Sequence, residues 1–274
     1  MNNLITRSVN IGQPINYEHS LNNGLLAWWN NIESTINGRQ IRDLTGRYHA
    51  QKVGAIGVRG GNPGGVRSHY FSSSGAYADA TLPSFTSPFT IALWAYHDIA
   101  SYGYPNSGVI CHSNVDDVPR VMKFSVCGAA ANNGVCDGAA FWRLLTPTTT
   151  MPVRVWTHWG FSWKNGTQAM YMNGLPNGTG THAYDMATTT LVRLGSSYTS
   201  NCFFGMLNDV RLYNRYLTAT EWANLYKISR GGNIELFNWR GIPLPRAAAM
   251  SACPNSIFDG GIFNSRTISA GGVL

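Results

Sequence analysis

The sequence is poor in charge, and acidic residues are scarcest. Only 12% of residues are charged, about half the share usual in a globular domain. The glutamates are Glu18, Glu33, Glu221 and Glu235. Retaining glycoside hydrolysis needs two carboxyl groups about 5 Å apart. No two glutamates are spaced for such a centre, and the adjacent Asp116 and Asp117 would point to opposite sides of a strand. The sequence therefore argues against a glycosidase.

Cysteine and nucleophile motifs are also missing. The five cysteines form no CxxC pair, which argues against a zinc site, and their odd number argues against a disulfide framework. Whether Cys127 and Cys136, which bracket a glycine- and asparagine-rich stretch, are bridged stays open. No Gly-x-Ser-x-Gly elbow supplies a serine nucleophile. His158 lies within an aromatic run, where we interpret it as a packed histidine and not as a catalytic base.

No segment directs the chain to a membrane. The N-terminus lacks the apolar core of a secretory signal, and no apolar run reaches transmembrane length. We therefore expect synthesis and folding in a cytoplasm. The net charge of +7 comes from basic residues scattered singly or in loose pairs, such as Arg39 and Arg42. Without a basic run, this charge favours weak attraction to a polyanionic surface and not a nucleic-acid site.

The sequence does contain many short strands joined by tight turns. Residues 89–97 (FTIALWAYH) place Phe89 and Leu93 on one face and Trp94 and Tyr96 on the other, which predicts a central strand covered on both sides. Residues 153–163 repeat this pattern, and an Asn-Gly turn at 165–166 leads to a partner strand at 168–172. Further strands are predicted at 24–29, 67–71, 108–112, 121–126, 139–145, 191–195 and 203–213.

One helix interrupts the strands. Thr218 and Glu221 fit a capping box, and Trp222, Leu225 and Tyr226 lie on one helical face. Many short strands without a βαβ rhythm predict an all-β sandwich of two sheets. The texture of the sequence divides it into an N-terminal arm at residues 1–23, a sandwich at 24–227 and a C-terminal docking tail at 228–274.

Four segments carry a family resemblance. They are GLLAWW with IRDLTGRYHA, FTIALWAYH, VWTHWGFSWKNGTQAMYMNG and FGMLNDVRLYNRYLTATEWANLY. Taken in this order over residues 24–227, they resemble the laminin-G-like branch of the concanavalin-A-like lectin and glucanase superfamily. The resemblance implies a two-sheet jelly-roll sandwich with one short helix.

The resemblance also implies a calcium site. Asp43 and Asp209 match positions that are acidic in that family and often lie together. Calcium takes six to eight oxygen ligands, of which two aspartates supply only a part. The alternative is that Asp43 caps its own turn while Asp209 pairs with Arg211 or Arg47.

A glycan site would use exposed aromatic rings stacked on sugars. Tyr102, Tyr104, Trp142, Tyr184 and Tyr198 lie in loop-like stretches and are the candidates. The Asn-Gly-Thr triplets at residues 165 and 177 match the glycosylation sequon, but we interpret them as turn chemistry.

The flanks complete the interpretation. Residues 228–274 are too apolar for a solvated disordered tail, so we expect them to lie along the sandwich or a neighbouring subunit. This plan resembles laminin-G-like proteins of tailed bacteriophages. It predicts a non-enzymatic virion protein, a head decoration (cement) or appendage protein, whose partners are major capsid or other virion proteins, copies of itself and host-surface glycans, without nucleic acid or membrane insertion. A carbohydrate-binding module of a cellular protein stays open as the alternative, and a glycan-active enzyme is disfavoured by the missing carboxylate pair.

Overall fold

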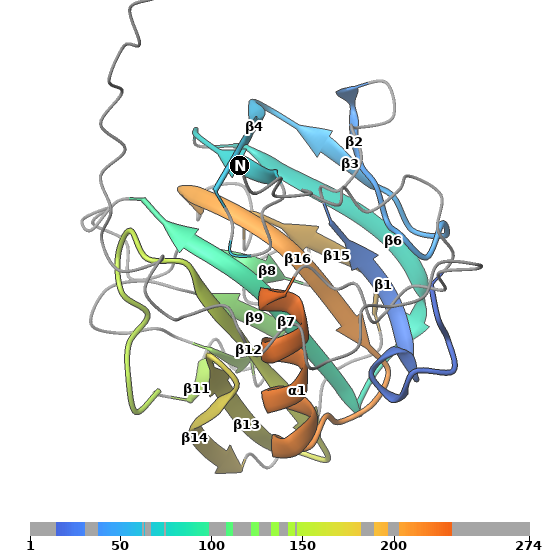
Figure 1. Ribbon diagram of the computed structural model, residues 1–274, viewed down its shortest axis with the longest axis vertical. Coiled ribbons are helices and arrows are strands. Elements are labelled where there is room, and N and C mark those ends of the chain that lie inside the picture. The colour runs from blue at the N-terminus through green and yellow to red at the C-terminus, as the bar shows by residue number, and fades with distance from the viewer. Residues whose placement is uncertain are drawn as a thin grey trace, which may run out of the picture. The chain divides into compact units, whose positions relative to one another are not determined.

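The computed structural model shows two antiparallel sheets packed face to face, with a helix against the outer face of one sheet (Figure 1). It describes residues 15–30, 38–61, 63, 67–73, 75–98, 147–181, 189–196 and 203–231, together with the backbone of four strands between residues 108 and 145. These sheets confirm the predicted concanavalin-A-like jelly-roll sandwich.

Sheet 1 has the strand order β14-β13-β12-β7-β16-β5-β4, and β1 also pairs with β16. Its strands are β1 (Leu25–Trp29), β4 (Ile56–Arg59), β5 (Ser68–Phe71), β7 (Phe89–His97), β12 (Thr157–Lys164), β13 (Thr167–Met172), β14 (Leu175–Thr181) and β16 (Gly205–Tyr213). Strand β16 is central, because it pairs with β7, β5 and β1.

Sheet 2 has the strand order β11-β10-β9-β8-β15-β6-β3-β2. Its strands are β2 (Gln40–Ile41), β3 (Ala50–Val53), β6 (Tyr77–Phe85), β8 (Gly108–Cys111), β9 (Met122–Ser125), β10 (Asn133–Cys136), β11 (Trp142–Leu145) and β15 (Thr189–Leu194). The longest of them is β6, which pairs with β15 on one side and β3 on the other.

The core lies between the sheets. As predicted, alternate residues of β7, including Phe89 and Leu93, point into it from sheet 1. They meet Val192 and Leu194 of β15 in sheet 2. Large rings fill the space between the curved sheets, since Trp29, Trp159, Trp163, Phe71 and Phe161 are all fully buried.

Some strand boundaries differ from the sequence prediction. The strand predicted to begin at residue 153 begins at Thr157, because Arg154 adopts a φ of 60° that interrupts the extended backbone. Val155, which the alternation placed inside, is 51% exposed. The predicted Asn-Gly turn is confirmed, with a φ of 49° at Asn165, and a second Asn-Gly turn has a φ of 51° at Asn173. The second triplet is not a turn, because Asn177 lies buried in β14.

The predicted helix is confirmed as α1 (Ala219–Arg230), with both hydrogen bonds of the capping box present. Trp222 and Leu225 are fully buried against sheet 1. The Trp222 ring stacks on Tyr171 of β13 at 4.8 Å and meets the His158 ring of β12 edge-on at 5.8 Å. Among the described residues, no helix is long and apolar enough to cross a bilayer.

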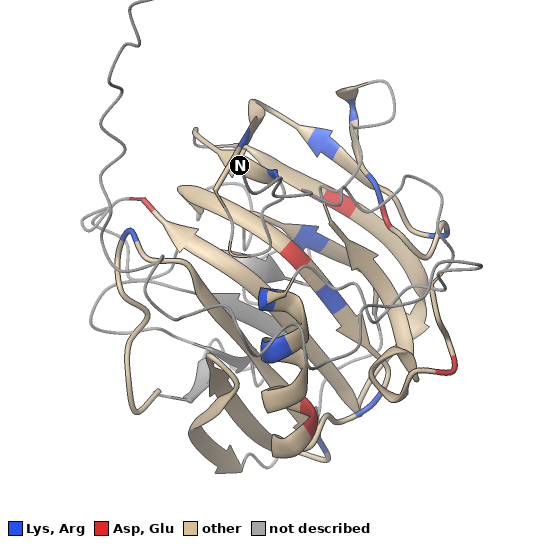
Figure 2. Ribbon diagram, viewed as in Figure 1, with Lys and Arg blue, Asp and Glu red and all other residues tan. Residues whose placement is uncertain are grey.

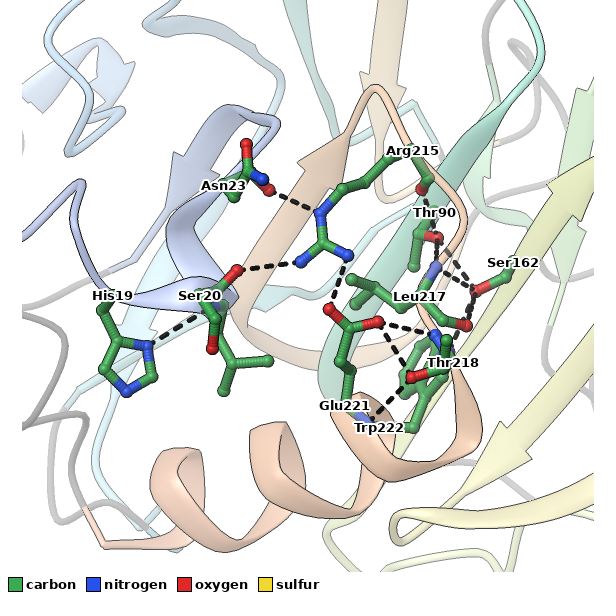
Figure 3. Close-up of polar contacts among 11 residues, drawn as sticks. His19, Ser20, Asn23, Thr90, Ser162, Arg215, Leu217, Thr218, Glu221 and Trp222 are labelled. Atoms are coloured by element: carbon green, nitrogen blue, oxygen red, sulfur yellow. Dashed lines mark hydrogen bonds and ion pairs between the residues drawn. The ribbon is translucent and has the colours of Figure 1, made fainter.

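A buried polar network fixes α1 over the sheet (Figure 3). The Ser162 hydroxyl of β12 accepts a hydrogen bond from the Trp222 indole at 2.9 Å and donates one to the Leu217 carbonyl at 3.1 Å. Thr90 of β7 shares a 2.9 Å hydrogen bond with Ser162 and accepts one from the Leu217 amide at 3.0 Å. A shift of the helix would therefore leave several buried polar groups unpaired.

Arg215 joins three parts of the chain (Figure 3). Its guanidinium donates to the carbonyl oxygens of Ser20, at 3.0 Å, and Asn23, at 2.6 Å, on either side of a short 3-10 helix, Ser20–Asn22. It also pairs with Glu221 of α1 at 2.6 Å. Leu21 is buried, so the end of the predicted arm packs on the sandwich.

Candidate functional site

Asp43, the first predicted calcium ligand, is buried in the turn between β2 and β3. One carboxylate oxygen accepts hydrogen bonds from the amides of Trp28, at 2.8 Å, and Thr45, at 3.0 Å. The other accepts from the Thr45 hydroxyl and from the amides of Arg47, at 3.2 Å, and Tyr48, at 2.8 Å. This carboxylate therefore closes its own turn by accepting from backbone donors.

Asp209, the second predicted ligand, lies at a bulge of β16 with a φ of 51°. Its carboxylate accepts from the Arg211 guanidinium at 2.9 and 3.0 Å and from the Trp28 indole. Arg211 is fully buried, and its guanidinium carbon lies 4.1 Å from the Trp28 ring. Burial alone lowers the pKa of Arg211, but Asp209 and Tyr213 raise it above its ordinary value, so the guanidinium stays charged.

The structure thus brings both aspartates to one residue, Trp28, but their oxygens do not fit calcium. Each carboxylate accepts from N–H donors, whereas a cation needs oxygen lone pairs that point at it. Within the described part of the chain, no group of three or more His, Cys, Asp or Glu side chains is placed to hold a metal. The contacts match the turn cap and the ion pair with Arg211, so calcium remains a prediction that these residues do not support.

The remaining ionisable side chains show no acid–base arrangement among the described residues. Asp79, Asp98 and Glu221 each pair with an arginine. Such pairing occupies a carboxylate that a retaining glycosidase would place opposite a second carboxyl group. His158 is packed as interpreted, with the Trp94 ring at 5.2 Å, and burial together with Arg211 lowers its pKa to about 3.

The outer face of sheet 2 carries a polar row that the sequence analysis missed. Alternation along β6 directs Ala78, Ala80 and Leu82 into the core and leaves Tyr77, Asp79 and Thr81 outside. Asp79 lies opposite Arg193 of β15 on one side and Gln51 of β3 on the other. We name Gln51, Tyr77, Asp79, Thr81 and Arg193 the sheet 2 row.

The geometry of this row fixes a carboxylate beside exposed hydrogen-bonding groups. Arg193 donates to both oxygens of Asp79 at 2.8 Å, and its guanidinium carbon lies 3.8 Å from the Tyr77 ring. The Asp79 side chain keeps 28% of its surface exposed, and Gln51 and Thr81 are exposed beside it. A fixed carboxylate, an amide, a hydroxyl and an aromatic ring are the groups that bind sugar hydroxyls and C–H faces.

The predicted glycan aromatics are not tested by the structure. Tyr102, Tyr104, Tyr184 and Tyr198 lie outside the described residues. Trp142 begins β11, but its side chain also lies outside what is described. The same is true of every cysteine side chain, including those of the pair whose bridging stayed open.

Asn177 shows why the second sequon-like triplet is not an open acceptor. Its side-chain amide accepts from the Thr149 amide and donates to the Thr149 carbonyl, both at 2.8 Å. The Asn177 side chain therefore links the loop at Thr149 to β14 by two hydrogen bonds, and its nitrogen is not available for modification.

The fold is that of a lectin-like sandwich, and the chain belongs to the concanavalin A-like lectin/glucanases superfamily. The family model for its laminin G-like domains matches residues 72–222. No curated protein sequence matches the chain.

Solved structures agree with this fold. Domain 4 of AbnA, a GH43 extracellular arabinanase from Geobacillus stearothermophilus solved with arabinotriose, is 18% identical with a TM-score of 0.59, over 74% of this chain and 98% of that one. A botulinum neurotoxin type C chain, from work showing that cell entry depends upon two ganglioside molecules, is 11% identical with a TM-score of 0.59, over 77% and 52%. Trypanosoma rangeli sialidase is 16% identical with a TM-score of 0.55, over 76% of this chain and only 33% of the sialidase. At these identities the likeness is one of fold.

Proposed function

We propose that the chain is a non-catalytic carbohydrate-binding module that holds a glycan on the sheet 2 row. The observation that carries the proposal is the Asp79–Arg193 pair, which is stacked on Tyr77 and flanked by the exposed side chains of Gln51 and Thr81. A carboxylate fixed by two hydrogen bonds needs little reordering when it accepts hydrogen bonds from sugar hydroxyls. The superfamily and the two neighbours connected with arabinotriose and gangliosides support this class of ligand.

The proposal that the module does not hydrolyse its ligand is supported by the contacts of its carboxylates. In the described residues, Asp79, Asp98, Asp209 and Glu221 each contact a guanidinium, and Asp43 accepts from backbone amides. Incubation with oligosaccharides that bind, followed by measurement of released reducing ends, tests this point. Turnover that survives extensive purification would contradict it.

The experiment for binding is an oligosaccharide array followed by calorimetric titration of every glycan that binds. Thr81→Ala and Gln51→Ala should each weaken binding about tenfold, because each removes a hydrogen-bonding group and leaves its partner on the sugar unpaired in the complex. Thr179→Ala is the matched control, since this exposed threonine lies on β14 of the other sheet. Equal affinities for all four proteins would remove the sheet 2 row from the proposal.

We further propose that the module works on a virus particle, as a bacteriophage head decoration or appendage protein that presents its sandwich outward. The support is the apolar character of residues 228–274, which include Ile257, Phe258, Ile262 and Phe263. Deleting residues 232–274 should abolish co-sedimentation with particles and leave the sandwich folded. Unchanged co-sedimentation would show that residues 232–274 do not dock the chain. Failure of the full chain to co-sediment with particles would favour the alternative, a carbohydrate-binding module of a cellular protein.

A further inference from the structure

A second surface of aromatic and charged side chains lies on the outer face of sheet 1, beside α1. The helix covers one part of this face, where the Trp94 indole donates to Ser229 at 3.0 Å and both Trp94 and His158 are buried. In the neighbouring part of the face, Tyr70, Tyr96 and Trp156 each keep some of their surface exposed. Figure 1 shows α1 crossing only part of this sheet.

These three side chains form a row across the strands. Tyr96 of β7 and Tyr70 of β5 are the register partners of Met206 of β16, one on each side. Trp156 immediately precedes β12, and its ring centroid lies 5.6 Å from that of Tyr96. We name Trp156, Tyr96, Met206 and Tyr70 the aromatic row; three inter-strand steps make it about 14 Å long.

A guanidinium marks one end of the aromatic row. Arg59 is exposed at the end of β4, and its guanidinium carbon lies 3.5 Å from the centre of the Tyr70 ring. Among the described residues, no carboxylate lies within ion-pair distance of Arg59. Stacking holds the guanidinium against the face of the Tyr70 ring and leaves its N–H edge for a planar anion such as a carboxylate.

The other charges along the row compensate each other. Asp98 lies 3.7 Å from the Arg154 guanidinium, which also donates to the Asp98 carbonyl at 3.0 Å. The Tyr70 hydroxyl donates to Asp98 at 3.4 Å, which holds the ring beneath Arg59. Figure 2 shows Lys and Arg distributed over several strands and turns, and Arg59 is the cation that lies on the Tyr70 ring at the end of the aromatic row.

We propose that the aromatic row binds an oligosaccharide that carries a carboxylate, with sugar rings stacked on Trp156 and Tyr96 and the carboxylate on Arg59. Aromatic side chains present about 150–250 Å² each, and these three are mostly buried, so the exposed rings offer on the order of 200 Å². A stable protein partner needs about 800 Å² on each side, which favours a small, flat ligand. The proposal shares only the ligand class with the proposed function, since it uses the opposite face of the sandwich.

The test is titration of the full chain with sialyllactose, an oligogalacturonide and a hyaluronan oligosaccharide, each beside its counterpart without a carboxylate. We expect at least one acidic probe to bind about tenfold more tightly than its counterpart. Arg59→Ala should abolish that difference, and Trp156→Ala should weaken both members of the pair. Arg39→Ala is the matched control, because this exposed arginine lies at the edge of sheet 2.

The outcomes separate the two proposals. Binding that responds to Arg59→Ala and Trp156→Ala, but not to Thr81→Ala, would support the aromatic row, and the sheet 2 row would then be judged by the array ligands and their response to Thr81→Ala. The reverse pattern, or equal affinity for acidic and neutral probes, would overturn the aromatic row and leave the proposed function standing. If the chain binds no glycan of the array and none of the acidic or neutral probes, both proposals are overturned. Circular dichroism of each variant checks that the sandwich stays folded.

Discussion

Three buried histidines with lowered pKa values should make the sandwich sensitive to mild acid. His69 and His158 have the large shifts, and burial also lowers the pKa of His97. Burial, with a smaller effect of Lys52, lowers the pKa of His69 to about 3, and burial with Arg211 does the same for His158. Among the described residues neither ring nitrogen of His69 has a hydrogen-bond partner, and His158 is enclosed by aromatic rings. Among the described residues, the His69 site therefore offers no acceptor to a protonated ring. The folded state therefore binds fewer protons than the unfolded state once the pH falls below about 6.5.

The magnitude follows from linkage. Because the folded-state pKa of each histidine is depressed, stability is fully present above about pH 6.5 and is lost as the pH falls toward 3. At pH 5 the loss is about 2 kcal/mol for each histidine and about 4 kcal/mol for both, relative to pH 8. Domains of this kind have total stabilities of about 5–15 kcal/mol, so the loss is a large fraction of the total.

Urea unfolding followed by tryptophan fluorescence at pH 8 and pH 5 measures this loss. The wild-type midpoint should fall by about 1.5 M or more, and His69→Phe or His158→Phe should each remove a large part of that fall. A wild-type midpoint that is the same at both pH values, or a double variant that keeps the whole fall, would refute the reasoning.

Three further predictions concern packing and metal binding. Gly160→Ala should cost about 3 kcal/mol or more in thermal unfolding, because a Cβ atom would lie 2.0 Å from a carbonyl oxygen of β7 and 2.6 Å from the Trp222 ring; an unchanged melting temperature would contradict the packing. Ser162→Ala should cost about 1–3 kcal/mol in thermal unfolding, because the buried indole N–H and the Leu217 carbonyl lose this partner, and only the indole's share of the cost should disappear in a Trp222→Phe background. Calcium or a chelator should leave the melting temperature unchanged, since Asp43 and Asp209 accept from N–H donors; a rise with calcium would restore the predicted metal site.

The sequence predicts best the elements whose pattern is set by burial. The bounds of β7 follow from residues 89–97 alone because both faces are covered, and the capping box of α1 is a local signal. β6 was missed although Tyr77, Asp79 and Thr81 alternate with core residues, because Pro83 and small alanines weaken the strand pattern. Short edge strands such as β2 and β4 have too few residues for any periodicity.

Site chemistry was harder to predict than fold, because it depends on partners distant in sequence. Asp43 and Asp209 were predicted as calcium ligands, and only the folded chain shows that Trp28 and Arg211 donate to their carboxylates. The aromatic row joins β5, β7, β16 and the residue before β12, and no local pattern indicates that these segments lie side by side.

The central position of β16 has a consequence for biosynthesis. This strand, Gly205–Tyr213, pairs with β7, β5 and β1, and β1 ends at Trp29. During synthesis, β1, β5 and β7 each keep an unpaired edge until β16 has emerged from the ribosome, roughly three quarters of the way along this sequence. No earlier segment takes the place of β16 beside them. Nascent chains stalled before residue 205 should therefore need chaperone protection from edge-to-edge aggregation, and completion of that one strand should release them.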